Sequence, residues 1–276
     1  MEEILIISLV ALGIVVGFIT GLLGIGGGFI LVPVFNSLFC SMDIPLDISI
    51  KMAVGTSLFT VFLTSVVSAY KHYLRGNILW RCSLVLGILG VIGSLIGLKI
   101  SMEYLSGDLH KRLFAILLIF ISIYGMCSVK RKILESIEAT YSTIDYRKLF
   151  VIGISVGIIS SIFGIGGGVV TIPLLIYLLR FPIRIAIGTS SGMMVLTSLI
   201  GIVGYMSVPC PIYRHLLNIG YVSLVVGLIV GFVAMISSRY GTVATYKVGS
   251  RTLKYILYSI LMLIGTWETV EYLVEH

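Results

Sequence analysis

The chain has 276 residues, of which 58% are hydrophobic and 11% are charged, against about 25% charged residues in soluble domains. With a mean hydropathy of +1.13, this composition excludes a water-soluble globular fold. The net charge is +7, but the basic residues lie between apolar runs, so no nucleic-acid partner is expected. The four cysteines are scattered without CxxC spacing, so neither a metal site nor a disulfide framework is expected. No cofactor is expected.

Ten apolar runs follow one another along the chain and predict its membrane segments. They lie at about 4–23, 29–40, 52–70, 79–100, 112–129, 149–163, 169–180, 185–206, 217–237 and 253–274. In a bilayer such runs form helices, because each backbone amide needs an internal partner. The runs 29–40 and 169–180 are short for a full crossing and predict half-helices or re-entrant arms. The predicted fold class is all-α integral membrane.

Two sequence motifs occur twice and divide the chain into two homologous halves. The segment 17–28, GFITGLLGIGGG, matches 157–168, GIISSIFGIGGG, and a proline follows each five residues later. The segment 51–57, KMAVGTS, matches 184–190, RIAIGTS. We also expect further matched glycines, pairing Gly93 with Gly227 and Gly97 with Gly231.

The duplication predicts three units along the chain. They are a first membrane repeat at 1–128, a polar linker at 129–148 and a second membrane repeat at 149–276. Each repeat is expected to contain about three full transmembrane helices and one broken or re-entrant helix pair.

The distribution of basic residues predicts the orientation of the halves. If each half crosses the membrane an odd number of times, fourteen of the 19 Lys and Arg residues fall on one face. An even number of crossings would place ten of these basic residues on one face and nine on the other. The positive-inside rule therefore favours the odd count and two inverted repeats. Both termini are then extracytoplasmic, the linker 129–148 is cytoplasmic, and the protein is expected to be a multi-pass protein of the plasma membrane.

The glycine runs are the most specific candidates for a binding site. Three consecutive glycines weaken a helix by about 1 kcal/mol each relative to alanine, so a broken helix is expected in each half. A helix that begins after Gly28 or Gly168 points its free N–H groups and its positive dipole end inward, which favours an anion. Close helix packing of the small-xxx-small kind is the structural alternative. The glycines concerned are Gly24, Gly26, Gly27, Gly28, Gly164, Gly166, Gly167 and Gly168.

Hydroxyl and cationic side chains complete the candidate site. Thr56, Ser57, Thr189 and Ser190 belong to the repeated Gly-Thr-Ser motif, and they either line the site or bond to their own helices. Lys51 and Arg184 occupy equivalent positions five residues before the threonines, and each is expected to attract anions into one vestibule. A snorkelling flank residue is the alternative.

An enzyme is the less favoured interpretation. The segment 188–192 reads Gly-Thr-Ser-Ser-Gly and fits the Gly-x-Ser-x-Gly pattern of serine hydrolases. The matching segment 55–59 lacks the final glycine. His72 and His215 lie near segment ends, and the other two histidines lie farther out. No catalytic residue is assigned, and an intramembrane serine hydrolase stays as an alternative.

The paired Gly-x-Gly-Gly-Gly…Pro and Ala-x-Gly-Thr-Ser motifs resemble the TauE/SafE sulfite exporter family over essentially the whole chain. The resemblance implies a membrane permease for sulfite, sulfonates or other sulfur-containing or organic anions. The matching positions add Pro33 and Pro173 to the glycines, threonines and serines above.

The sequence therefore predicts a secondary transporter that moves a small anion by alternating access, because inverted halves are typical of such transporters. An anion channel or facilitator and a non-transporting scaffold are the alternatives. The expected partners are a small anionic substrate and the lipid bilayer.

Overall fold

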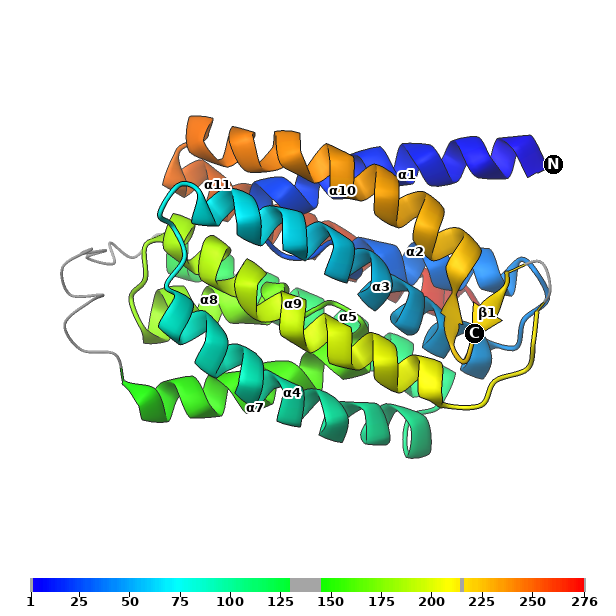
Figure 1. The fold of residues 1–276 in the computed structure, drawn as a ribbon. Coiled ribbons are helices and arrows are strands. Elements are labelled where there is room, and N and C mark those ends of the chain that lie inside the picture. Colours follow the sequence, from blue (N-terminus) through cyan, green and yellow to red (C-terminus); the bar gives the residue numbers. More distant parts are fainter. Residues whose placement is uncertain (1, 130–144, 214–215, 276) are drawn as a thin grey trace.

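The computed structural model describes residues 2–129, 145–213 and 216–275, and in these ranges it shows ten helices and one short β-hairpin (Figure 1). The elements of the first half are α1 (Glu2–Leu23), α2 (Gly28–Cys40), α3 (Leu46–Tyr73), α4 (Trp80–Glu103) and α5 (Gly107–Val129). Those of the second half are α7 (Tyr146–Phe163), α8 (Gly168–Leu178), α9 (Ile183–Ser207), β1 (Asn218–Ile219), β2 (Val222–Ser223), α10 (Leu224–Lys247) and α11 (Ser250–Glu275). Most of the predicted linker 129–148 lies outside the described residues.

Eight of these helices are long and apolar enough to cross a bilayer, namely α1, α3, α4, α5, α7, α9, α10 and α11. The two remaining helices, α2 and α8, are shorter and also apolar. Large hydrophobic side chains such as Ile4, Phe120 and Phe232 are exposed on the outside, as expected for contact with lipid. The predicted all-α integral membrane fold is confirmed.

One predicted segment begins too early. The apolar run at 217–237 suggested a helix from its first residue, but the chain forms the β1–β2 hairpin before α10 starts at Leu224. Gly220 has a φ of 52°, and the side chain of Asn218 donates to the carbonyls of Pro211 and Gly220. These local bonds favour a turn over a first helical turn.

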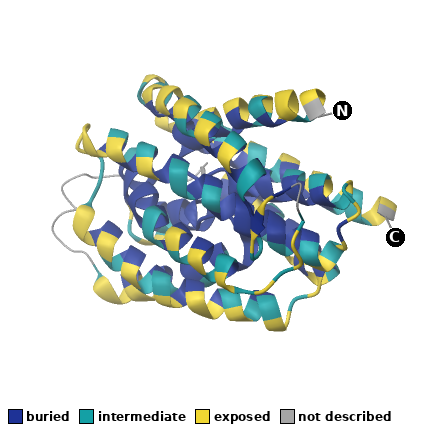
Figure 2. Ribbon diagram, turned by 45° about the vertical axis from the view of Figure 1, so that its right-hand side comes forward, coloured by how far each residue is buried: buried dark blue, intermediate teal, exposed yellow. Residues whose placement is uncertain are grey.

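The helices α3 and α9 form the centre of the bundle. In each, 72% of the most apolar window is buried, against 33–50% in the six other spanning helices of the described ranges. Figure 1 shows α3 and α9 between one pair, α1 and α10, and a second pair, α4 and α7. Figure 2 shows that residues in the centre of this arrangement are buried and that the outer faces of the surrounding helices are exposed.

The packing partners of the two halves correspond. The helix α1 packs along α10 as α7 packs along α4, and α3 contacts α10 as α9 contacts α4. Small residues allow this approach: a side chain on Gly157 would overlap the backbone of Gly90, and one on Gly17 would overlap the backbone of Ala234.

The predicted pairing of Gly93 with Gly227 and of Gly97 with Gly231 is wrong. Gly87 faces Leu196 of α9, and Gly231 faces Leu63 of α3. Because these two leucines are equivalent in the repeated motif, Gly231 corresponds to Gly87 and not to Gly97. By the same contacts, Gly97 corresponds to Gly241, since they face the matched residues Ile158 and Phe18. The hairpin before α10 adds residues to the second half, so the spacing in sequence between equivalent residues changes after α9.

Candidate functional site

The glycine runs form the breaks between α1 and α2 and between α7 and α8. In the first break Gly24, Gly26 and Gly27 have φ values of 65°, 82° and 73°. In the second break the matching values, at Gly164, Gly166 and Gly167, are 67°, 71° and 93°. Residues with a Cβ rarely adopt this left-handed region. Each run therefore reverses the chain inside the bundle, as the sequence predicts.

The two breaks lie against each other in the interior. A Cβ on Gly28 would lie 2.7 Å from the Cα of Ile165, and one on Gly168 would lie 2.6 Å from the Cα of Ile25. All residues of 24–28 and 164–168 are buried. The structure thus brings together the eight glycines that the sequence singles out, and in this conformation it closes them off from both ends.

The breaks leave helix ends without side-chain caps. α2 starts after Gly27 and α8 after Gly167, and neither N-cap forms a side-chain hydrogen bond. The first intrahelical bonds are donated to the carbonyls of these two glycines from three and four residues ahead. The N–H groups at each helix start therefore stay available, and they carry the positive end of the helix dipole.

The two prolines lie inside the short helices and not at their starts. Pro33 is the sixth residue of α2, and Pro173 is the sixth residue of α8. Because proline lacks an N–H, each removes one bond to the carbonyl four residues earlier. The prolines therefore loosen the first turns next to the glycine breaks.

The equivalent serines behave differently. Ser57 donates a hydrogen bond of 2.9 Å to the carbonyl of Gly164, which ties α3 to the second break. Ser190 is also fully buried, yet its Oγ has no hydrogen-bond partner among the described residues. Of the two equivalent serines, only Ser190 therefore keeps a free hydroxyl.

The two threonines hold helix starts in the opposite half. Thr56 accepts a hydrogen bond of 3.0 Å from the backbone N–H of Ser223, just before α10. Thr189 accepts one of 3.2 Å from the N–H of Leu79, just before α4. These bonds satisfy a buried backbone donor at Ser223 and a partly buried one at Leu79, each at the end of a helix connection. Both threonines therefore have a visible positioning role.

Thr56→Val is expected to lower the free energy of unfolding by about 1–3 kcal/mol, because it leaves the buried N–H of Ser223 without an acceptor. Thr189→Val is expected to have a smaller effect in the same direction, because the N–H of Leu79 is partly buried. Thermal unfolding in detergent measures the effect. Thr266→Val is the matched control, since Thr266 is exposed and bonds within its own helix. Equal stability of all three variants would contradict the positioning role.

Further unpaired hydroxyls lie at the breaks and were not singled out as site residues. Thr20 and Ser160 are equivalent, both are buried, and neither Oγ has a partner among the described residues. The Thr20 hydroxyl lies where a side chain on Gly27 would be, and Ser160 lies beside Gly167. Ser161 has a third such hydroxyl. These hydroxyl residues could have been found from the sequence, because they lie inside the repeated segments 17–28 and 157–168.

Lys51 and Arg184 lie at opposite ends of the bundle, at the starts of the antiparallel helices α3 and α9 (Figure 1). Lys51 donates to the carbonyl of Met102 at 3.3 Å. Arg184 donates to the carbonyls of Tyr246 and Val248 at 3.3 Å each. The predicted vestibule residues thus flank the glycine breaks without reaching them.

The arrangement around Ser190 lacks the hydrogen bonds of a serine nucleophile. His72 contacts the neighbouring Gly188, but it bonds through Nδ1 to Tyr246, and its Nε2 has no partner among the described residues. A nucleophile and its base should lie within hydrogen-bond reach. His215, the other histidine near a segment end, lies outside the described residues.

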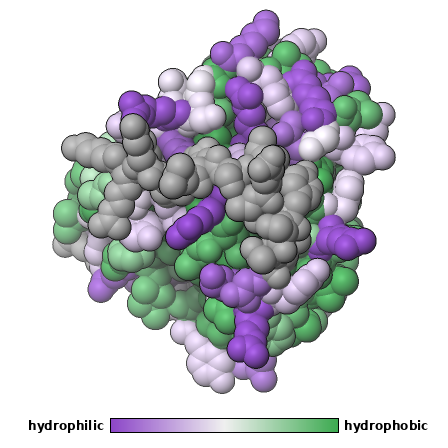
Figure 3. Space-filling model, turned by 90° about the vertical axis from the view of Figure 1, so that its left-hand side faces the viewer, coloured by the Kyte–Doolittle hydropathy of each residue, from purple (hydrophilic) through white to green (hydrophobic). Residues whose placement is uncertain are grey.

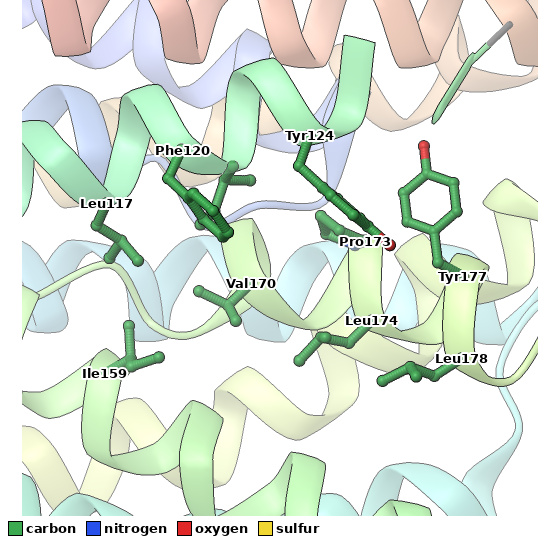
Figure 4. A pocket seen from close by; sticks show the side chains of 10 residues that line it. Leu117, Phe120, Tyr124, Ile159, Val170, Pro173, Leu174, Tyr177 and Leu178 are labelled. Atoms are coloured by element: carbon green, nitrogen blue, oxygen red, sulfur yellow. The ribbon is translucent and has the colours of Figure 1, made fainter. Parts of the chain in front are cut away.

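A lateral groove between α5, α7 and α8 has a different character. Its volume is about 320 Å³, and Figure 4 shows Phe120, Tyr124 and Leu174 among its lining side chains. The lining contains no charged residue. Such a surface suits apolar chains and does not suit an anion.

Comparisons with known proteins agree with a bundle of membrane helices, and together they define a membrane transporter rather than an enzyme. Residues 9–267 match the family model "Sulfite exporter TauE/SafE", and the chain belongs to this family.

Several curated relatives are named as transporters. One from Methanocaldococcus jannaschii, named "Probable membrane transporter protein", is 34% identical over 93% of this chain and 92% of its own length. One of the same name from Haemophilus influenzae is 30% identical over 92% and 94% of the two chains. The YunE protein of Bacillus subtilis, also so named, is 28% identical over 94% and 95%. No solved structure gives a significant match.

Proposed function

We propose that this protein is a secondary transporter for a small oxyanion, such as sulfite or a sulfonate, in the plasma membrane. The proposed site forms where the two glycine breaks meet, and it opens when the breaks, which are in contact in this conformation, move apart. The N–H groups at the starts of α2 and α8 and the free hydroxyls of Thr20, Ser160 and Ser190 are the proposed ligands. Ser57, Thr56 and Thr189 position the backbone around it.

The observation that carries this proposal is the pair of uncapped helix starts facing each other next to unpaired hydroxyls. An unpaired buried hydroxyl costs about 1–3 kcal/mol, and several of them together suggest a polar solute in another state of the cycle. No Lys, Arg, Asp or Glu occurs in 17–28, 52–65, 157–168 or 185–198. Backbone dipoles therefore supply the positive potential that an anion needs.

We further propose that the units 1–128 and 149–276 are inverted repeats joined by a cytoplasmic linker, with both termini outside the cytoplasm. The matching contacts of α1 with α10 and of α7 with α4 support this, as does the opposite direction of α3 and α9. Two such halves can exchange conformations and expose one site to each side in turn. The burial of both breaks favours this cycle over an open channel.

Reconstitution into liposomes tests the proposal. We expect saturable uptake of sulfite or a small sulfonate, measured against protein-free liposomes, with imposed proton and sodium gradients to identify coupling. Sulfate and thiosulfate serve as competitors. Flux that does not saturate with concentration would indicate a channel, and no flux of any of these anions would exclude the proposed substrate class.

A further inference from the structure

The ring of Tyr246 in α10 lies between two arginines at the end of the bundle where α9 begins. The Cζ of Arg75 is 4.0 Å from the ring centroid, and the Cζ of Arg184 is 5.6 Å from it. Arg75 also donates to the carbonyl of Thr242 at 3.5 Å. A cation over an aromatic ring is a weaker contact than a guanidinium bound to an oxyanion.

Neither arginine has a carboxylate partner among the described residues. The ion pairs found there include Lys111 with Glu271 and Lys148 with Asp145, which lie elsewhere. The Nε of Arg184 is buried and has no hydrogen-bond partner in the described part of the chain. The two guanidinium groups therefore contact an aromatic ring and backbone carbonyls. Among the described residues, no carboxylate neutralises their positive charge.

The hydroxyl of Tyr246 connects this pair of arginines to the proposed anion site. It bonds to Nδ1 of His72 at 2.8 Å and accepts a bond from Nδ2 of Asn77 at 3.1 Å. His72 and Asn77 pack against Gly188. A Cβ at Gly188 would overlap the carbonyl of Asn77 and lie 3.2 Å from the Cβ of His72. The connection that contains Asn77 also bonds to α9 directly beside Ser190, because the N–H of Leu79 donates to the hydroxyl of Thr189. Tyr246 therefore helps to hold the segment from Asn77 to Leu79 against this part of α9.

The opposite end of the bundle has a different charge arrangement. Lys51, which is equivalent to Arg184, lies at the end where Lys111 pairs with Glu271 and where Asp47 accepts from the N–H of Gly107. Lys111 has a carboxylate partner there, whereas Lys51 bonds to a backbone carbonyl and Arg112 lies over the ring of Tyr272. Figure 3 views the arginine end and shows hydrophilic side chains interspersed with hydrophobic ones on this face. The arginine end differs in that two guanidinium groups lie around one tyrosine ring.

We propose that Arg75, Arg184 and Tyr246 form an anion-operated gate, in which an oxyanion competes with the tyrosine ring for the two guanidinium groups. This inference rests on the proposed transport of an oxyanion. When the anion binds the arginines, the ring leaves, its bonds to His72 and Asn77 break, and the segment leading to Ser190 opens. The arginines are thus a first docking site at this end of the path.

Equilibrium binding of sulfate in detergent at constant ionic strength tests the competition. Tyr246→Ala is expected to tighten sulfate binding about tenfold, because it removes the competing ring. Adding Arg75→Gln and Arg184→Gln to this variant should abolish the gain, whereas adding Lys51→Gln should keep it. Unchanged or weaker binding in Tyr246→Ala would overturn the proposal, and so would a gain that survives without the arginines.

Cysteine labelling tests the gate without any need for transport. In a background in which Cys40, Cys82, Cys127 and Cys210 are replaced, Ser190→Cys reports access by a neutral, membrane-impermeant maleimide from the arginine end. Tyr246→Ala should raise the labelling rate about tenfold, and Lys51→Gln should not. An unchanged rate in Tyr246→Ala would refute the gate. Absence of uptake of both sulfite and the small sulfonates by the unmodified protein would instead contradict the proposed function.

Discussion

Gly28→Ala and Gly168→Ala are each expected to abolish transport and to reduce stability. A Cβ at either position would meet the backbone of the opposite break, at Ile165 or at Ile25 respectively. Backbone atoms cannot rotate away as a flexible side chain can, so the two breaks must move apart. Overpacking of this kind costs about 1–3 kcal/mol. The same displacement moves the helix starts that we propose as anion ligands.

Uptake in liposomes and thermal unfolding in detergent measure the two effects separately. Gly249→Ala is the matched control, because its Cβ would lie 3.8 Å from the hydroxyl of Thr252, an ordinary contact, and its φ lies outside the left-handed region. We expect this control to fold and transport normally. Full uptake by a stable Gly28→Ala protein would show that the close contact of the breaks is dispensable.

Ser190→Ala and Ser57→Ala are expected to have opposite profiles although the residues are equivalent in sequence. Ser190→Ala removes an unpaired buried hydroxyl, so stability should be kept or rise while uptake falls sharply. Ser57→Ala removes the donor to the carbonyl of Gly164, so stability should fall by about 1–3 kcal/mol. The difference follows from one hydrogen bond that the first half makes and the second half lacks among the described residues.

Melting temperature and initial uptake rate distinguish these profiles. Ser207→Ala is the matched control, since Ser207 is exposed and its hydroxyl bonds to the carbonyl of Val203 in its own helix. If Ser190→Ala is destabilised like Ser57→Ala, its hydroxyl has a structural partner. If it is stable and transports at the full rate, Ser190 is not a ligand.

The helix breaks could be predicted from the sequence because they depend on local backbone chemistry. Three consecutive glycines in an apolar run disfavour a helix in any membrane context, and α2 and α8 begin at Gly28 and Gly168 as expected. The prediction of a membrane bundle likewise needed little beyond hydropathy, because the bilayer leaves the chain few other ways to satisfy its backbone.

The partners of polar side chains could not be predicted in the same way. Thr56 and Thr189 share a motif with Ser57 and Ser190, yet they accept from backbone groups far away in the sequence. The difference between Ser57 and Ser190 depends on tertiary contacts that a repeated motif hides. The glycine pairing failed because the equivalent positions are 133 residues apart at Leu63 and Leu196 but 144 apart at Gly87 and Gly231.

The packing of α1 along α10 has a consequence for biogenesis. α1 ends at Leu23, whereas its main neighbour begins only at Leu224. During translation, the glycine face of α1 at Gly13, Gly17 and Gly21, which packs on α10 in the folded protein, therefore stays in contact with lipid or with an insertion factor until most of the chain has been made. Assembly of this transporter must wait for α10, so a chain that stops before Leu224 leaves α1 without its partner.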